Sequence, residues 1–216
     1  MKIYIMEADT EKPFSEYEKY LSCISLQRKN RIERFRFEKD KTVSLCSELL
    51  VRCKLSEILE VNPKEIIIES KENGKPYVSN FENIHFSLSH SRNMILLAVD
   101  KERIGADIEF TGKNNTDIAK SFFTNSEYNY IIKSENPTKS FYTVWTMKEA
   151  YLKMTGDGIV NGLDNFDVFS TKFKRMLKTY IYKDKYMTAI CSEIWNNKEI
   201  KPVTVNIRDI LGCILP

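Results

Sequence analysis

Residues 105–109 of this chain constrain its fold more than any other segment. Their sequence, Gly-Ala-Asp-Ile-Glu, alternates small or apolar residues with carboxylates, which predicts a β-strand. Alternate side chains of a strand share a face, so Asp107 and Glu109 project together while Ala106 and Ile108 face the core. Such an edge offers the oxygen ligands that Mg²⁺ prefers. A solvated strand face would show the same Asp-x-Glu pattern.

Residues 145–153 add a third carboxylate and a lysine. Their sequence, Trp-Thr-Met-Lys-Glu-Ala-Tyr-Leu-Lys, predicts a helix in which Trp145, Glu149 and Lys153 form one stripe, because they are spaced by four. If the stripe lies against the strand, Glu149 completes a metal site and Lys153 meets a phosphate. An ordinary surface pair of Glu149 and Lys153 is the other interpretation. Three carboxylates and a lysine are what a Mg²⁺-dependent reaction on a pyrophosphate requires.

The composition indicates a compact protein with balanced charge. The 216 residues are 42% hydrophobic, with only 7 Gly and 6 Pro, so the chain can bury one core or form two small, closely packed halves. Its 33 Lys and Arg against 30 Asp and Glu give a formal charge of +3. This balance argues against binding to nucleic acid or to a membrane surface.

Several features of the sequence indicate a cytoplasmic protein. The 5 cysteines include no Cys-x-x-Cys pair, which is typical of reduced thiols. The N-terminus has the pattern of a strand and not of a signal peptide. No stretch approaches the roughly 18 apolar residues of a membrane span.

Helices precede strands in both parts of the chain. In the first part we expect a strand at 1–7, helices at 15–25, 26–37 and 41–60, a β-branched run at 66–68, a turn at 73–76, and strands at 84–89, 94–99 and 104–110. In the second part we expect helices at 118–123, 126–133 and 139–154 and strands at 166–169, 180–182 and 187–191. The helix at 41–59 followed by the strand at 94–99 has a counterpart in 139–154 followed by 187–191, which indicates a duplicated architecture.

Other polar side chains are candidate phosphate ligands. His90 lies at a predicted strand end among Ser87, Ser89 and Ser91, an arrangement that suits charge-assisted hydrogen bonds to a phosphate. A basic cluster upstream has guanidinium groups that also suit phosphate. Its members are Arg28, Lys29, Arg31, Arg34 and Arg36. A structural histidine and a solvated helix face are the alternatives.

Taken together and in chain order, these segments resemble the Sfp-type 4′-phosphopantetheinyl transferases over essentially the whole chain. The matching segments are Gly74-Lys75-Pro76-Tyr77, Phe86-Ser87-Leu88-Ser89-His90-Ser91, residues 105–109, Phe122-Phe123 with Glu127-Tyr128, and residues 145–153. The resemblance implies an α+β fold of two similar α/β halves related by pseudo-twofold symmetry. We place the first half, with the coenzyme A contacts, at residues 1–103 and the second half, with the carboxylates and the lysine, at 104–216.

The resemblance also implies a role for each matching position. The positions that match Mg²⁺ ligands are Asp107, Glu109 and Glu149. The other implied contacts to coenzyme A are Arg28, Ser44 and His90 at the 3′-phosphate, Arg31 and Lys153 at the pyrophosphate, and Lys75 and Ser89 beside the adenine and ribose. Arg28 and Arg31 stand where well-known relatives have lysine, and Ala106 replaces a larger aliphatic residue. Both departures keep the charge or the apolar character.

The implied reaction transfers the phosphopantetheine arm of coenzyme A to a serine hydroxyl of an acyl or peptidyl carrier protein and releases adenosine 3′,5′-bisphosphate. Lys153 would stabilise the leaving phosphate, and Glu149 is the candidate base for the hydroxyl. The carrier could serve fatty-acid, polyketide or nonribosomal-peptide synthesis, including antibiotic synthesis. We expect a monomer, because a chain of two halves can close the site alone.

Two other classes of protein would use some of the same residues. A Mg²⁺-dependent phosphodiesterase or nuclease could place the basic cluster on a polynucleotide, although the near-neutral charge argues against it. A non-catalytic module could bind coenzyme A or a carrier domain, but binding alone does not need all the carboxylates and Lys153. We expect carrier recognition within residues 112–130, where Phe122 and Phe123 are either a docking pair or part of the core.

Overall fold

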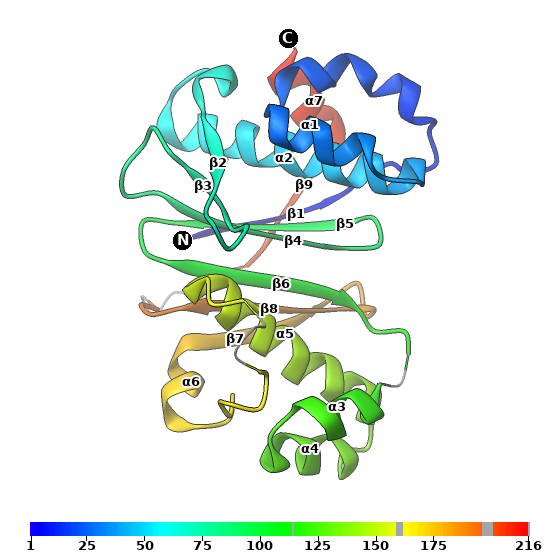
Figure 1. Cartoon of the computed structure of the whole chain (residues 1–216), viewed down its shortest axis with the longest axis vertical. Helices are drawn as coiled ribbons and strands as arrows, with labels where there is room; N and C mark the ends of the chain where they lie inside the picture. Colours follow the sequence, from blue (N-terminus) through cyan, green and yellow to red (C-terminus); the bar gives the residue numbers. More distant parts are fainter. Residues whose placement is uncertain (114, 159–161, 196–200, 216) are drawn as a thin grey trace.

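The protein consists of two halves with the same order of elements, a strand, a long helix and two further strands (Figure 1). A computed structural model describes residues 1–113, 115–158, 162–195 and 201–215. The elements of the first half are β1 (Lys2–Glu7), α2 (Glu38–Leu59), β4 (His85–Ser91) and β5 (Met94–Asp100). Those of the second half are β6 (Ile104–Phe110), α5 (Pro137–Thr155), β7 (Leu177–Tyr182) and β8 (Tyr186–Ser192).

The strand pairing repeats as well. The order is β4-β5-β1 in the first sheet and β7-β8-β6 in the second, and every one of these pairs is antiparallel. In each half, the last strand (β5 or β8) therefore lies between two others. It pairs with the first strand (β1 or β6) on one side and with the remaining strand (β4 or β7) on the other. The duplicated α+β architecture predicted from the order of helices and strands is confirmed.

Shorter elements complete each half. The first half contains η1 (Phe14–Glu16), η2 (Glu18–Cys23), α1 (Leu26–Glu33), η3 (Pro63–Glu65), β2 (Ile68–Ser70) and β3 (Pro76–Val78). The second contains α3 (Thr116–Phe122), α4 (Asn125–Ile132) and α6 (Thr171–Met176). The chain then returns to the first half, where β9 (Val203–Val205) pairs in parallel with β1 and α7 (Ile207–Ile214) packs on α2. The proposed boundary between residues 103 and 104 stays a prediction, and β9 and α7 lie with the first half.

The structure differs from the predicted elements in several segments. Residues 15–25 form two short 3₁₀-helices in place of one helix, and α6, β9 and α7 were not predicted. Residues 166–169, predicted as a strand, are irregular at 166–167 and enter a turn at 168–169. Their backbone is bound by side chains and not by a neighbouring strand: Lys148 Nζ donates to Phe166 O at 2.7 Å, and Val168 N donates to Glu127 Oε1 at 2.9 Å.

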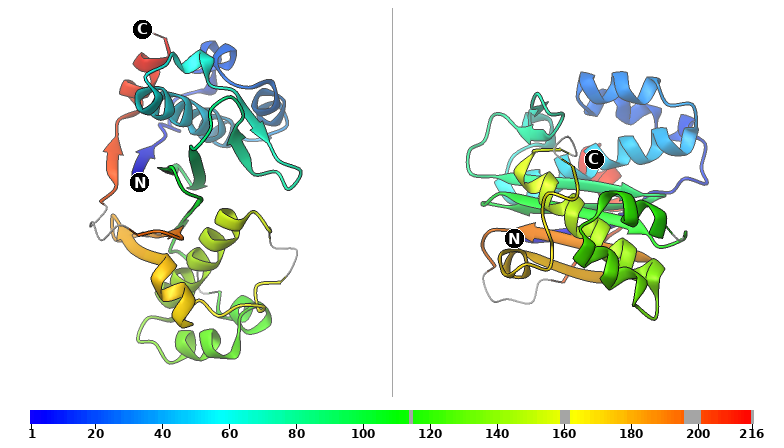
Figure 2. Two further views of the ribbon diagram at one scale, coloured as in Figure 1. Left: turned by 90° about the vertical axis from the view of Figure 1, so that its left-hand side faces the viewer. Right: turned by 60° about the horizontal axis from the view of Figure 1, so that its bottom comes forward.

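Three buried apolar clusters lie between four layers, with the helices of each half on the outer side of its sheet (Figure 2). The outer clusters join α2 to the first sheet and α5 to the second. The middle cluster joins the two sheets face to face, with Ile5 and Leu96 from the first and Ala106 and Ile108 from the second. Ala106 and Ile108 thus face the core, as the strand pattern predicts.

Gly105 lets α5 approach β6 closely. A Cβ atom at this position would overlap the carbonyl oxygen of Ala150 and lie 2.6 Å from the backbone nitrogen of Met154. Alternate residues of a strand share a face, so Asp107 and Glu109 point to the same side as Gly105, toward α5. The close approach therefore sets the distance between these carboxylates and the helix that carries Glu149.

We predict that Gly105→Ala lowers the free energy of unfolding by about 3 kcal/mol or more, because the added methyl group meets backbone atoms that no side-chain rotation can move. Gly212→Ala in α7 is the matched control, since a Cβ atom there meets nothing within 4 Å. Urea denaturation followed by circular dichroism measures both variants. Equal stability of the two variants would contradict the close approach of α5 to β6.

Candidate active site

Three serines of β4 connect the two halves at the candidate site. β4 and β6 are edge strands of separate sheets, and Ser87, Ser89 and Ser91 alternate along β4. Ser87 Oγ accepts a hydrogen bond from Ala106 N at 2.9 Å, and Ser91 Oγ accepts one from Phe110 N at 3.0 Å. Side-chain hydroxyls therefore satisfy backbone donors that an edge strand would otherwise leave without a partner.

The same serines hold the carboxylates of β6. Ser89 Oγ donates to Asp107 Oδ1 at 2.7 Å, and Ser91 Oγ donates to Glu109 Oε2 at 2.8 Å. The three hydroxyls that the sequence offered as phosphate ligands thus have another use, which is to join β4 to β6. The alternation that places Ser87, Ser89 and Ser91 on one face matches the alternation of Asp107 and Glu109.

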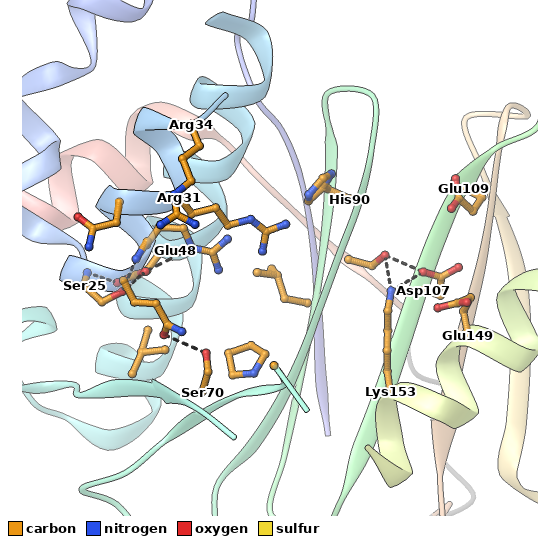
Figure 3. Close-up of a pocket in the computed structure, with 18 of the residues that line it drawn as sticks. Ser25, Arg31, Arg34, Glu48, Ser70, His90, Asp107, Glu109, Glu149 and Lys153 are labelled. Atoms are coloured by element: carbon orange, nitrogen blue, oxygen red, sulfur yellow. Dashed lines mark hydrogen bonds and ion pairs between the residues drawn. The ribbon is translucent and has the colours of Figure 1, made fainter. Parts of the chain in front are cut away.

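Lys153 of α5 reaches this cluster from the second half. Its Nζ atom lies 2.6 Å from Asp107 Oδ1 and 2.9 Å from Ser89 Oγ (Figure 3). Asp107 is almost fully buried, with 2% of its surface exposed. A buried carboxylate needs a charged partner, and Lys153 provides it.

Two carboxylate oxygens of this cluster are available to bind a cation. Asp107 Oδ2 and Glu149 Oε1 are buried and have no hydrogen-bond partner among the described residues. Burial and the charge of Asp107 raise the pKa of Glu109 to about 6 and also raise the pKa of Glu149. Within the described part of the chain, no group of three His, Cys, Asp or Glu side chains already has metal-ligating geometry. The two unpartnered oxygens nevertheless fit a hard divalent cation.

Cationic side chains from the first half face this cluster across a cleft. α1 carries Arg28 and Arg31, and Arg34 is its C-cap residue. Its first turn is capped by Ser25 Oγ, which accepts a hydrogen bond from Arg28 N at 3.3 Å. His90 of β4 points into the same space (Figure 3). Burial lowers the pKa of His90, and the charges of Lys153, Arg31 and Arg28 lower it further. A bound anion would relieve this repulsion.

The cleft brings together segments that are far apart in the sequence. Its volume is about 740 Å³, within the range of sites for small ligands. The predicted site residues that line it are Arg28, Arg31, Ser89, His90, Asp107, Glu109, Trp145, Glu149 and Lys153. The stripe of Trp145, Glu149 and Lys153 therefore does face the Asp-x-Glu strand.

Two predicted residues lie beside the cleft. Ser44 is buried in α2, and its hydroxyl accepts a hydrogen bond from Arg28 Nη1 at 3.5 Å. Lys75 lies between β2 and β3, where its Nζ atom donates to Met154 O at 3.0 Å and Asn73 Nδ2 donates to Gly156 O. This turn therefore contacts the last carbonyl groups of α5. Lys75 lines an adjoining pocket of about 240 Å³, and burial lowers its pKa to about 8.

The two phenylalanines that are candidates for carrier docking differ in burial. Phe123 is 6% exposed and stacks on Phe141 with the ring centroids 5.6 Å apart, so it belongs to the core. Phe122 is 55% exposed and is free to contact another molecule. Residue 114 of the proposed docking segment lies outside the described residues.

Ser25 and Glu48 line the cleft but were not identified from the sequence. The only local signal for Glu48 is its spacing of four from Arg52, which is also typical of ordinary surface pairs on a helix.

The fold and the site define a protein of two similar halves with arginines and a histidine opposite a cluster of carboxylates in one cleft. Residues 11–102 match the family model described as 4′-phosphopantetheinyl transferase, N-terminal, and residues 103–205 match that of the 4′-phosphopantetheinyl transferase superfamily. The 4′-phosphopantetheinyl transferase Sfp of Bacillus subtilis (strain 168) is 31% identical, covering 89% of this chain and 92% of its own length. The 4′-phosphopantetheinyl transferase psf-1 of Bacillus pumilus is 30% identical, covering 99% of this chain and 96% of its own length.

The chain therefore belongs to the 4′-phosphopantetheinyl transferase superfamily. The reaction of this family is the transfer of phosphopantetheine to carrier proteins. Membership favours a transferase over the nuclease and the non-catalytic binding module.

Proposed function

We propose that this protein transfers the 4′-phosphopantetheine arm of coenzyme A to a serine of an acyl or peptidyl carrier domain in a Mg²⁺-dependent reaction. The observation that carries this proposal is the composition of one cleft, in which arginines and His90 lie opposite three carboxylates and Lys153. Coenzyme A has two separate phosphate groups, a 3′-phosphate and a pyrophosphate. A cleft with cations at one end and carboxylates with a lysine at the other suits both groups.

The cationic end suits the nucleotide part of coenzyme A. Arg28 and His90 would bind the 3′-phosphate, with Ser44 behind Arg28, and Arg31 would bind the pyrophosphate. We place Lys75 beside the adenine and ribose, in the adjoining pocket that it lines. Ser89, predicted beside the adenine and ribose, contacts Asp107 and Lys153, which supports a place on the side of the ribose that faces the pyrophosphate.

The carboxylate end suits the metal and the reacting atoms. Asp107, Glu109 and Glu149 would hold Mg²⁺, which supplies charge neutralisation at the pyrophosphate when bound. The carrier serine oxygen attacks the phosphorus of the pantetheine side, and the bond to the bridging oxygen breaks. Glu149 would take the serine proton, because its Oε1 atom has no hydrogen-bond partner among the described residues. Lys153 would donate a hydrogen bond to the leaving phosphate of adenosine 3′,5′-bisphosphate.

Other properties of the protein remain proposals. Residues from both halves of the chain close the cleft, so the site does not need a second copy, which supports a monomer. The five cysteines are free thiols, in keeping with a cytoplasmic location. Of the helices in the described ranges, none has the length and apolar character that a membrane span needs.

Two observations concern the partners of the protein. The exposed Phe122 supports carrier docking at α3, and the near-neutral charge supports the absence of nucleic-acid binding.

We predict that the protein, incubated with coenzyme A, Mg²⁺ and apo carrier domains, raises the mass of a carrier by about 340 Da, the mass of the phosphopantetheine arm. Excess EDTA should abolish the increase, because the three carboxylates then lose their shared cation. A carrier in which the acceptor serine is replaced by alanine is the control and should keep its mass. A panel of apo carriers that all keep their mass while coenzyme A is unconsumed would contradict the proposal.

We predict that Asp107→Asn abolishes the stabilisation of the protein by Mg²⁺ and coenzyme A, because an amide is a poor ligand for Mg²⁺. In the unsubstituted protein this stabilisation is about 2.7 kcal/mol at a hundredfold excess over the dissociation constant. Thermal unfolding with and without Mg²⁺ measures it without any carrier. Asp184→Asn, an exposed position in the β7–β8 turn, is the matched control and should keep the full effect. A Mg²⁺ effect that survives Asp107→Asn would remove Asp107 from the metal site.

A further inference from the structure

A buried carboxylate lies at the base of the cationic end of the cleft. Glu48 of α2 is 1% exposed, yet it lines the same cleft as Arg28. A carboxylate at this place would repel a bound phosphate unless other groups offset its charge. The contacts of Glu48 show which groups do so.

One group, the guanidinium of Arg52, holds the Glu48 carboxylate on the side away from the cleft. Arg52, one turn along α2, donates to Glu48 Oε1 through Nε at 2.9 Å, and its Nη2 atom forms an ion pair with the same oxygen at 2.9 Å. The same guanidinium donates through Nη1 to the carbonyl oxygens of Pro63 at 3.2 Å and Ile66 at 2.7 Å. Arg52 is itself buried, so Glu48 is fixed to the loop that precedes β2 and cannot change rotamer without breaking several hydrogen bonds.

On the cleft side, Glu48 organises the start of α1. Its Oε1 atom accepts a hydrogen bond from Ser25 N at 2.6 Å, and its Oε2 atom accepts one from Ser25 Oγ at 2.9 Å. Ser25 in turn caps α1 through the backbone nitrogen of Arg28. Glu48 Oε2 also lies 3.5 Å from Arg28 Nε. One carboxylate thus fixes both the backbone and the guanidinium of Arg28.

These contacts leave one edge of Arg28 available. The guanidinium has five N–H donors in a rigid plane. Its Nε atom pairs with Glu48 and its Nη1 atom donates to Ser44 Oγ at 3.5 Å, while no such contact of Nη2 is found among the described residues. The charges of Arg28 and Arg52 against the single charge of Glu48 leave a net positive charge at this end of the cleft. A planar group held on one side and free on the other suits bidentate binding of a phosphate.

We propose that Glu48 is a positioning residue that orients Arg28 toward the 3′-phosphate of coenzyme A. This inference rests on the proposed function, which assigns that phosphate to Arg28. It adds a specificity determinant that does not touch the nucleotide: Glu48 acts through Arg28 and Ser25. Its loss should weaken recognition of the 3′-phosphate and leave the contacts to the rest of coenzyme A unchanged.

The test compares coenzyme A with dephospho-coenzyme A, which lacks only the 3′-phosphate. Isothermal titration calorimetry of the full chain should give tighter binding of coenzyme A, and Glu48→Gln should reduce this preference roughly tenfold, as expected for the loss of one charge-assisted hydrogen bond. The affinity for dephospho-coenzyme A should not change. Glu57→Gln on the same helix, with a side chain 49% exposed, is the matched control and should keep the full preference.

A second comparison separates positioning from a general structural role. In an Arg28→Met background, the preference for coenzyme A should already be reduced to what His90 provides, and Glu48→Gln should have no further effect on it. If Glu48→Gln weakens both nucleotides equally, or lowers the preference in the Arg28→Met background, the inference is overturned. If Glu48→Gln does not give a cooperative unfolding transition, Glu48→Asp, which keeps the charge but shortens the side chain, is measured in its place with the same expectations.

Binding and transfer are measured separately, so the two proposals can fail independently. Failure of every carrier to gain mass would refute the transferase function, whatever the calorimetry shows. An unsubstituted protein that binds both nucleotides equally would refute the assignment of the 3′-phosphate to Arg28, and with it the role of Glu48, even if carriers are modified.

Discussion

The hydrogen bonds between β4 and β6 are the interactions on which the rest of the site depends. Two edge strands normally meet through backbone pairing or are kept apart. Here the Ser87 and Ser91 hydroxyls accept from backbone N–H groups of β6, while Ser89 and Ser91 donate to Asp107 and Glu109. Side chains therefore fix the register of the two halves. The same hydroxyls hold the carboxylates toward α5, so fold and site share one set of contacts.

Each half also contains a buried ion pair that attaches a loop to its long helix. In the first half, Arg52 of α2 pairs with Glu48 and donates to two carbonyl groups of the following loop. In the second, Lys148 of α5 pairs with Glu127 at 2.8 Å and donates to the carbonyls of Leu163 and Phe166. Breaking such a pair typically costs about 3–5 kcal/mol, because a charge is left buried without a partner. The duplication thus extends from the strand order to a buried ion pair on each long helix.

Periodicity in the sequence predicted the features of the structure that lie within a single helix or strand. The alternation of 105–109 placed Asp107 and Glu109 on one face, and the spacing of four placed Glu149 and Lys153 on one stripe. Contacts between distant segments were not predictable in this way. Residues 166–169 have a strand-like pattern, but the buried Lys148 and Glu127 satisfy their backbone. β9 has only 3 residues, too few for an alternation to be recognised. Glu48 was missed because only the fold places Ser25 and Arg28 against it.

The central claim is that one molecule of coenzyme A spans the cleft from the arginines of the first half to the carboxylates of the second. A crystal structure of the complex with coenzyme A and Mg²⁺ tests this most directly. The account predicts the 3′-phosphate within hydrogen-bonding distance of Arg28 and His90, and a metal ion that joins the pyrophosphate to Asp107, Glu109 and Glu149. A nucleotide bound outside this cleft, or a pyrophosphate that makes no contact with the carboxylate end, would contradict it.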